Sequence, residues 1–296
     1  MSSAWDYLKI DAHVHLWEVQ QGRIEGKDVY ALNNGKSMFL GEVRQMMPPF
    51  MTDGCNDAEM LMANMDYAQV NGCVVTQEYM DGNQNAYLKK VREKYPDRFR
   101  ICSLYEEKDH FELDGFDGLK ICAGRLADQD LTKILPVFQR VEAAGKFISI
   151  DMADGDAQTE GLQAVIDACP DLKIAIGHFG MVTTKGWEKQ IALAKNKNVY
   201  IESGGLTWLF HKEFYPYRGA IEAILEAKSI CGMEKLMWGS DYPRTIADIT
   251  YRSAVRFLVE ADRLSEEDKR LFLGENAVRF YGFEGLKPMP FIDNML

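Results

Sequence analysis

Two histidines separated by one residue, His13 and His15, lie near the start of the chain in the stretch YLKIDAHVHLWE. Because side chains alternate along a strand, we expect Lys9, Asp11 and both histidines on one face and apolar residues on the other. Residues i and i+2 of a strand are about 6.6 Å apart, so two imidazoles at this spacing can bind one metal ion. The pair predicts a zinc site or, as the alternative, hydrogen-bonded core histidines.

The polar row on this strand is costly inside a protein, because each unpaired buried polar group costs about 1–3 kcal/mol. Packing alone therefore does not explain four such side chains in a row. We expect the row to point into the lumen of the fold and to share a pocket with other residues that carry chemistry.

Further residues of this kind follow short apolar runs. His178 ends KIAIGH, and Asp241 follows LMWGS, with Arg244 three residues later. Taken singly, such a histidine is also typical of a core or a surface, and such an aspartate of a helix N-cap. Because these residues all come at the ends of apolar runs, we expect them to meet in one cleft with the residue types of a hydrolytic site. The other polar residues at or near the ends of apolar runs are Tyr79, Lys120, Asp151 and Glu202.

Aromatic residues gather in the segment GGLTWLFHKEFYPYR, which contains Trp208 and Phe210. With Trp17 and Tyr79 they suggest a ring-shaped ligand, although ordinary packing is an equally good interpretation. Two further histidines, His110 and His211, lie in polar surroundings, and we expect both to be solvated.

The chain alternates two kinds of element that would position these residues. Eight short apolar runs occupy 7–16, 71–79, 99–105, 116–122, 146–152, 172–178, 198–203 and 235–241. Amphipathic helical patterns occupy 85–95, 131–145, 157–170, 185–196, 218–232 and 246–261. This alternation over about 250 residues predicts an α/β fold, the (β/α)8 TIM barrel, whose active sites lie at the carboxyl ends of the strands. An open, doubly wound sheet is the alternative, but the chain has no GxGxxG turn for a dinucleotide.

No linker divides the sequence, so we expect residues 1–296 to form a single domain. The first strand-to-helix connection is unusually long, at about 18–57, and we expect it to fold over the barrel mouth.

The composition of the chain limits the kinds of molecule that it is expected to bind. The 296 residues carry a net charge of −11, which disfavours nucleic acid and anionic membranes, and 47% are hydrophobic, which supports a full core. The six cysteines form no CxxC pair and several lie in apolar runs, so we expect reduced thiols and a cytoplasmic protein. No apolar run is long enough to span a bilayer. The expected partner is a small molecule, anionic or cyclic, and a homodimer is the expected assembly.

The motifs together resemble the amidohydrolase-related superfamily. IDAHVHLWE resembles its opening strand, IAIGHFG its strand-six histidine motif, LMWGSDYPR its strand-eight motif, and LGENAVRFYGF its closing helix. The resemblance covers nearly the whole chain and implies a TIM barrel that activates water for hydrolysis or, in one branch, decarboxylates its substrate.

In one respect the sequence departs from the metal-dependent members, which usually have a histidine or a carbamylated lysine at the end of strand five. Here that place holds Asp151. HLW, GLKIC and SGGL resemble instead the lactonase branch, which acts on sugar lactones and pyrone-dicarboxylate lactones and whose sites can work without metal. His13, His15 and Asp241 could hold Zn²⁺, or the enzyme could be metal-independent.

The resemblance favours a lactonase in which Asp241 is the general base for the attacking water. His178 and the pair His13 and His15, or the ion that the pair holds, would stabilise the oxyanion. The expected substrate contacts are Lys120, Arg244, Tyr79, Glu202, Trp208 and Asp151. A metal-dependent decarboxylase and a non-catalytic sugar-acid binding protein are the alternatives.

Overall fold

Eight parallel strands form a barrel that helices surround, in a computed structural model that describes residues 4–51, 53–107 and 111–290. The strands follow one another around the barrel in the order of the chain. They are β1 (Ile10–Val14), β6 (Gly72–Val75), β7 (Phe99–Leu104), β8 (Gly118–Cys122), β9 (Phe147–Asp151), β10 (Lys173–Ile176), β11 (Val199–Glu202) and β12 (Leu236–Met237). The predicted (β/α)8 barrel is confirmed, and each strand lies within one of the eight predicted apolar runs.

The barrel closes between β12 and β1 by a few backbone hydrogen bonds rather than by a ladder. Ala12 N–H donates to Trp238 O at 2.9 Å, Asp241 N–H to His13 O at 2.9 Å, and His15 N–H to Tyr242 O at 2.7 Å. We call this contact the seam. It brings the histidine motif directly against the turn that carries Asp241.

Two apolar layers stabilise the barrel, one inside it and one between strands and helices. Ile10 and Ala12 lie inside, in a cluster that continues with residues from five other strands and from the last helix. The outer layer contains Val14 and most of the buried helical residues.

This arrangement corrects the expectation for the polar row on β1. Lys9 does not face the lumen, because its Nζ donates to the carbonyls of Trp5 and Tyr7 near the start of the chain. Asp11 points toward the surrounding helices, where the hydroxyl of Tyr251 donates to it. The register with β6 shifts between Asp11 and Val14, and this bulge reverses the alternation. Both histidines, unlike the preceding polar residues, therefore turn inward, and His15 lines the pocket.

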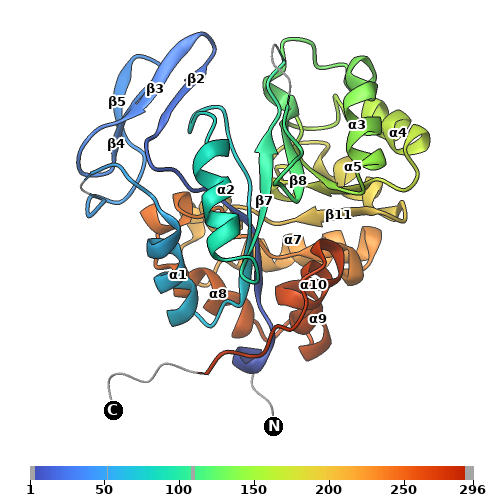
Figure 1. The fold of residues 1–296 in the computed structure, drawn as a ribbon. Helices are drawn as coiled ribbons and strands as arrows, with labels where there is room; N and C mark the ends of the chain where they lie inside the picture. Colours follow the sequence, from blue (N-terminus) through green and yellow to red (C-terminus); the bar gives the residue numbers. More distant parts are fainter. Residues whose placement is uncertain (1–3, 52, 108–110, 291–296) are drawn as a thin grey trace, which may run out of the picture.

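The 18–57 segment forms a sheet of its own. Strands β2 (Gln21–Ile24), β3 (Lys27–Ala31), β4 (Lys36–Phe39) and β5 (Glu42–Gln45) make an antiparallel meander beside the end of the barrel toward which β7 points (Figure 1). Most of this sheet is exposed, whereas Trp17, Met47 and Met51, which flank it in the sequence, are buried together. Backbone hydrogen bonds join its first strand to the loop after β6.

Three of the helices begin where a side chain accepts from a free backbone N–H group of the first turn. Asp57 caps α1, Thr250 caps α8, and Ser265 with Asp268 forms a capping box on α9. The helices are α1 (Ala58–Tyr67), α2 (Asn85–Lys94), α3 (Leu135–Ala143), α4 (Thr159–Ala168), α5 (Trp187–Ala192), α6 (Leu206–Leu209), α7 (Arg218–Cys231), α8 (Tyr251–Val259), α9 (Glu266–Arg270) and α10 (Asn276–Tyr281).

Three of the predicted helical patterns yield a shorter α-helix. The pattern at 185–196 forms α5 and then a 3₁₀ turn at Leu193–Lys195. The pattern at 131–145 divides into a 3₁₀ turn at Leu131–Ile134 and then α3, because Pro136 fits the first turn of a new helix. The pattern at 246–261 yields α8 only from Tyr251, because Thr250 caps it there. All six cysteines are free thiols, and among the described helices none has both the length and the apolar character needed to cross a bilayer.

We predict that Asn276→Ala lowers the free energy of unfolding by about 2–4 kcal/mol, because it strips two buried carbonyls of their donor. The fully buried Asn276 amide donates to Met233 O and Leu236 O, which ties α10 to β12. Urea unfolding measures the change. The exposed Asn33→Ala is the matched control, expected within about 0.5 kcal/mol of the unmodified protein; equal effects of both variants would contradict the assignment.

Candidate active site

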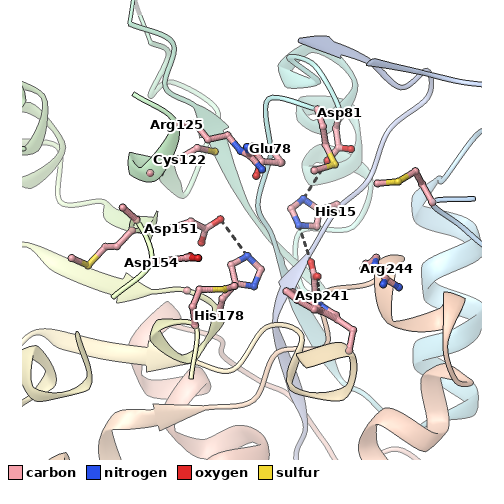
Figure 2. A pocket seen from close by; sticks show the side chains of 18 of the residues that line it. His15, Glu78, Asp81, Cys122, Arg125, Asp151, Asp154, His178, Asp241 and Arg244 are labelled. Carbon is pink, nitrogen blue, oxygen red and sulfur yellow. Dashed lines mark hydrogen bonds and ion pairs between the residues drawn. The ribbon is translucent and has the colours of Figure 1, made fainter. Parts of the chain in front are cut away.

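A cavity of about 540 Å³ opens at the carboxyl ends of the barrel strands (Figure 2). Its polar side chains come from the ends of several strands, and its apolar wall contains two tryptophans and several methionines. Prominent lining residues are His15, Trp17, Met46, Met47, Glu78, Met80, Asp81, Cys122, Arg125, Asp151, Met152, Asp154, His178, Met181, Trp208, Asp241 and Arg244.

The histidine pair and Asp241 converge on one point. His13 Nε2 lies 3.0 Å from His15 Nε2, and Asp241 Oδ1 lies 3.7 Å and 3.2 Å from these two nitrogens. Ligands about 2.1 Å from a tetrahedral zinc ion are about 3.4 Å from one another. The donor set therefore has the spacing that a divalent ion with three protein ligands would need.

A second layer of carboxylates orients the two imidazoles. Glu202 Oε1 lies 2.6 Å from His13 Nδ1, and both side chains are fully buried. Asp81 Oδ2 lies 3.4 Å from His15 Nδ1 (Figure 2). Carboxylates in this position fix the ring orientation of metal-binding histidines and direct Nε2 to the ion. Burial holds the pKa of His13 well below its usual value, which favours the neutral imidazole that a metal requires.

The small sheet contributes to this layer. Ser37 Oγ of β4 donates to Gln20 Oε1 at 2.8 Å, and the Gln20 amide donates to Asp81 Oδ1 at 3.1 Å. Backbone bonds also join the sheet to the loop after β6, since Arg23 N–H donates to Tyr79 O. The 18–57 segment thus helps to place Asp81, the carboxylate beside His15.

Asp241 is held from both sides. Trp208 Nε1–H donates to its Oδ2 at 2.7 Å, which leaves Oδ1 to face the histidines. Its backbone has a left-handed φ of 60°, a strained conformation that aims the carboxylate into the pocket. Burial alone would raise the pKa of Asp241, but the hydrogen bond with His15 and the charge of His178 lower it to about 2.

A second cluster joins the ends of β8, β9 and β10. Lys120 Nζ lies 2.6 Å from Asp151 Oδ2, and His178 Nε2 lies 3.5 Å from the same oxygen, while His178 Nδ1 bonds Gly204 O at 2.9 Å. Burial opposes ionisation of Asp151, but the Lys120 ammonium and His178 outweigh it and hold the pKa of Asp151 well below its usual value.

This second cluster, with His13, is close enough together to be considered as a metal site. It fits a cation less well than the first, because Asp151 already balances the Lys120 ammonium and a further cation would be repelled. We therefore assign the metal-binding geometry to His13, His15 and Asp241.

Two arginines at the pocket wall offer positive charge. Arg125, three residues after β8, has its Nε 2.9 Å from Glu78 Oε1, and Arg244 has one terminal nitrogen 3.2 Å from Asp248 Oδ2. Arg244 was predicted from the sequence, but Arg125, Asp81 and the methionines at 46 and 47 were not. Counting three residues past the GLKIC run would have found Arg125.

Three predicted substrate contacts need correction. Lys120 and Glu202 are fully buried beneath the pocket wall, so each acts on a neighbouring side chain, Asp151 or His13, rather than on a ligand. Tyr79 lies outside the pocket, with its hydroxyl donating to Tyr105 O. Its neighbours Glu78 and Met80 line the cavity.

The remaining predicted residues divide between the pocket and its surroundings. Asp151, Trp208 and Trp17 line the pocket, whereas Phe210 does not. His211 is exposed, as expected. His110 lies outside the described residues.

The eight-stranded α/β barrel thus has histidines at the ends of its first and sixth strands and an aspartate after its eighth, at the end where barrel enzymes have their active sites. The family model described as Amidohydrolase matches residues 10–283. The chain belongs to this amidohydrolase family, which confirms the resemblance inferred from the motifs. None of the curated proteins compared with the chain matches it.

Solved structures share the fold at low identity. An amidohydrolase from Burkholderia multivorans with bound zinc is 15% identical, with a TM-score of 0.68 over 93% of this chain and 99% of its own. A protein assigned as a 2-pyrone-4,6-dicarboxylic acid hydrolase from Acinetobacter baumannii, with citric acid bound, is 19% identical, with a TM-score of 0.67 over 93% and 99%. The 5-carboxyvanillate decarboxylase of Novosphingobium aromaticivorans, in complex with manganese, is 18% identical, with a TM-score of 0.53 over 77% and 81%.

We predict that Lys120→Met lowers the free energy of unfolding by about 3–5 kcal/mol, because it leaves the buried Asp151 carboxylate without its cation. The double variant Lys120→Met with Asp151→Asn is expected to recover part of this loss, since the uncompensated charge is gone. Urea unfolding of the three proteins measures both effects. A single variant as stable as the unmodified chain would show that the ion pair does not compensate the charge of Asp151.

Proposed function

We propose that this chain is a metal-dependent hydrolase that opens a carboxylated lactone. The observation that carries the proposal is the convergence of His13 Nε2, His15 Nε2 and Asp241 Oδ1 within 3.0–3.7 Å at the base of a pocket with arginines on its wall. These three residues would hold the ion, which when bound supplies a Lewis acid and lowers the pKa of water.

Asp241 removes a proton from the attacking water as the water oxygen bonds to the lactone carbonyl carbon. His178, held by Asp151 and Gly204 O, faces the pocket and stabilises the negative charge that develops on the carbonyl oxygen. When the ring C–O bond breaks, the proton passes to the leaving oxygen. Water and lactone thus yield one hydroxy acid, with no other reactant.

The pocket wall suggests the rest of the substrate. Arg125 and Arg244 each use one partner carboxylate and have further N–H groups that can bind an anion, which suits a substrate carboxylate. The tryptophans at 17 and 208 and the methionines suit the apolar face of a ring. The citric acid in the Acinetobacter baumannii neighbour supports an acidic ligand, and the zinc in the Burkholderia multivorans neighbour supports the metal.

Decarboxylation is the second candidate, because the manganese-containing decarboxylase shares the fold. The hydrolase is favoured because the Acinetobacter baumannii neighbour matches 93% of this chain, against 77% for the decarboxylase. A screen of sugar and aromatic-acid lactones, with zinc-loaded and chelator-treated protein, tests the choice: ring opening supports the hydrolase, release of carbon dioxide supports the alternative, and undiminished ring opening after complete metal removal overturns the metal requirement.

We predict that Asp241→Asn lowers kcat by about 10²–10⁴-fold, because the amide cannot accept the proton of the attacking water. Steady-state kinetics with a lactone found in the screen measures the loss. The exposed Asp156→Asn, which alters only a surface pair with Lys189, serves as the matched control and is expected to retain activity. Near-normal turnover by Asp241→Asn would refute its role as the base.

We predict that Arg125→Ala raises KM for a carboxylated lactone by about 10–100-fold, the loss of one charge-assisted hydrogen-bonding partner. KM for the corresponding uncharged lactone should change little, because it offers Arg125 no anion. The exposed Arg263→Ala controls for the loss of one positive charge. The role of Arg125 is excluded if KM rises equally for both substrates.

A further inference from the structure

Asp11 is a buried carboxylate that the proposed chemistry does not use. It is completely inaccessible and accepts four hydrogen bonds. Its Oδ1 accepts from Ser240 N–H at 2.8 Å and from His13 N–H at 3.2 Å, and its Oδ2 accepts from Ser240 Oγ at 2.5 Å and from Tyr251 OH at 2.7 Å. Burying a carboxylate between the barrel and a helix is energetically unfavourable. The segments that its hydrogen bonds connect indicate what it contributes.

The four donors lie on three separate segments of the chain. His13 lies in the bulge of β1, Ser240 directly precedes Asp241, and Tyr251 begins α8. Asp11 therefore connects the backbone of one proposed metal ligand with the residue adjacent to another. It contacts no ligand atom itself.

The connection falls where the barrel lacks a ladder. β12 has two residues, and the parallel bridge across the described seam, between Val14 and Tyr242, lies beyond the end of β12. The turn after β12 also has to lie unusually close to His13, since a Cβ placed on Gly239 would be 2.9 Å from His13 Cβ. Small shifts across this seam would change the separation of His13, His15 and Asp241.

We propose that Asp11 is a positioning residue that locks the β1 bulge to the turn at 239–241 and so sets the distance between the histidine pair and Asp241. Ser240 and Tyr251 are its two side-chain partners in this role. Ser240 extends the lock by accepting from Tyr242 N–H at 3.0 Å, which fixes the far side of the same turn. The part of this inference that concerns metal rests on the proposed function, whereas the part that concerns the seam does not.

The first test is hydrogen–deuterium exchange of the metal-free protein, followed by mass spectrometry. In Asp11→Asn the amide cannot accept from every donor, so peptides that contain the seam amides of Ala12, His15 and Asp241 should exchange about tenfold faster. Peptides that cover β10 and β11 should be unchanged. Tyr251→Phe, which removes one of the four hydrogen bonds, should give a smaller change at the same peptides.

The matched control is Asp268→Asn, which also alters a buried carboxylate, but one whose side-chain partners, Ser265 N–H and Lys228, do not belong to the seam. This variant should leave seam exchange unchanged. If Asp11→Asn accelerates exchange everywhere, or nowhere, then Asp11 stabilises the fold generally or not at all, and the proposal is wrong.

The second test is zinc affinity, measured by competition with a chromophoric chelator. Asp11→Asn should weaken zinc binding about 10–100-fold, the effect typical of residues that orient metal ligands, while Asp268→Asn binds as the unmodified chain does. If the unmodified chain binds no zinc, the metal assignment under the proposed function fails, and the exchange experiment alone decides the role of Asp11. Unchanged zinc affinity together with accelerated seam exchange would show that the lock does not set ligand separation and would overturn that claim.

Discussion

The structure depends on holding two imidazole nitrogens and a carboxylate oxygen within 3.0–3.7 Å of one another in a buried place. Such groups do not gather by packing, because burial of unpaired polar atoms is unfavourable. Each is therefore supported from behind: His13 by Glu202, His15 by Asp81, and Asp241 by Trp208. The barrel supplies this support because all its parallel strands bring their carboxyl ends to one side.

A second constraint is the balance of charge across the pocket. The Lys120 ammonium lies fully buried beside Asp151, so the carboxylate at the end of β9 is already neutralised. This ion pair gives Asp151 a role at the end of the fifth barrel strand, where metal-dependent members of the family were expected to have a histidine or a carbamylated lysine. Because the charge of Lys120 repels a further cation near Asp151, an added cation is better accommodated between the histidine pair and Asp241.

The sequence was sufficient to predict the barrel, because eight apolar runs separated by amphipathic patterns leave few other arrangements. It also located His13, His15, His178 and Asp241 at the strand ends. It failed for Lys9 and Asp11 because strict alternation was assumed, and a bulge is a tertiary feature that no local pattern marks.

Other parts of the site depended on contacts between distant segments. Lys120 and Glu202 are polar residues at strand ends, but only the fold shows that they lie beneath the pocket wall rather than in it. The 18–57 segment was expected only as a long connection folded over the barrel mouth. Its antiparallel sheet, and its link through Gln20 to Asp81, follow from pairing that the sequence alone does not specify.

X-ray absorption at the zinc edge of the zinc-loaded protein reports whether His13, His15 and Asp241 bind the ion. We predict a four-coordinate ion with two imidazole ligands and two oxygens at about 2.0–2.1 Å, one from Asp241 and one from water. His15→Ala should remove one imidazole from that spectrum. A spectrum of the unmodified protein with no imidazole scattering, or with sulfur ligands, would contradict the assignment of the site.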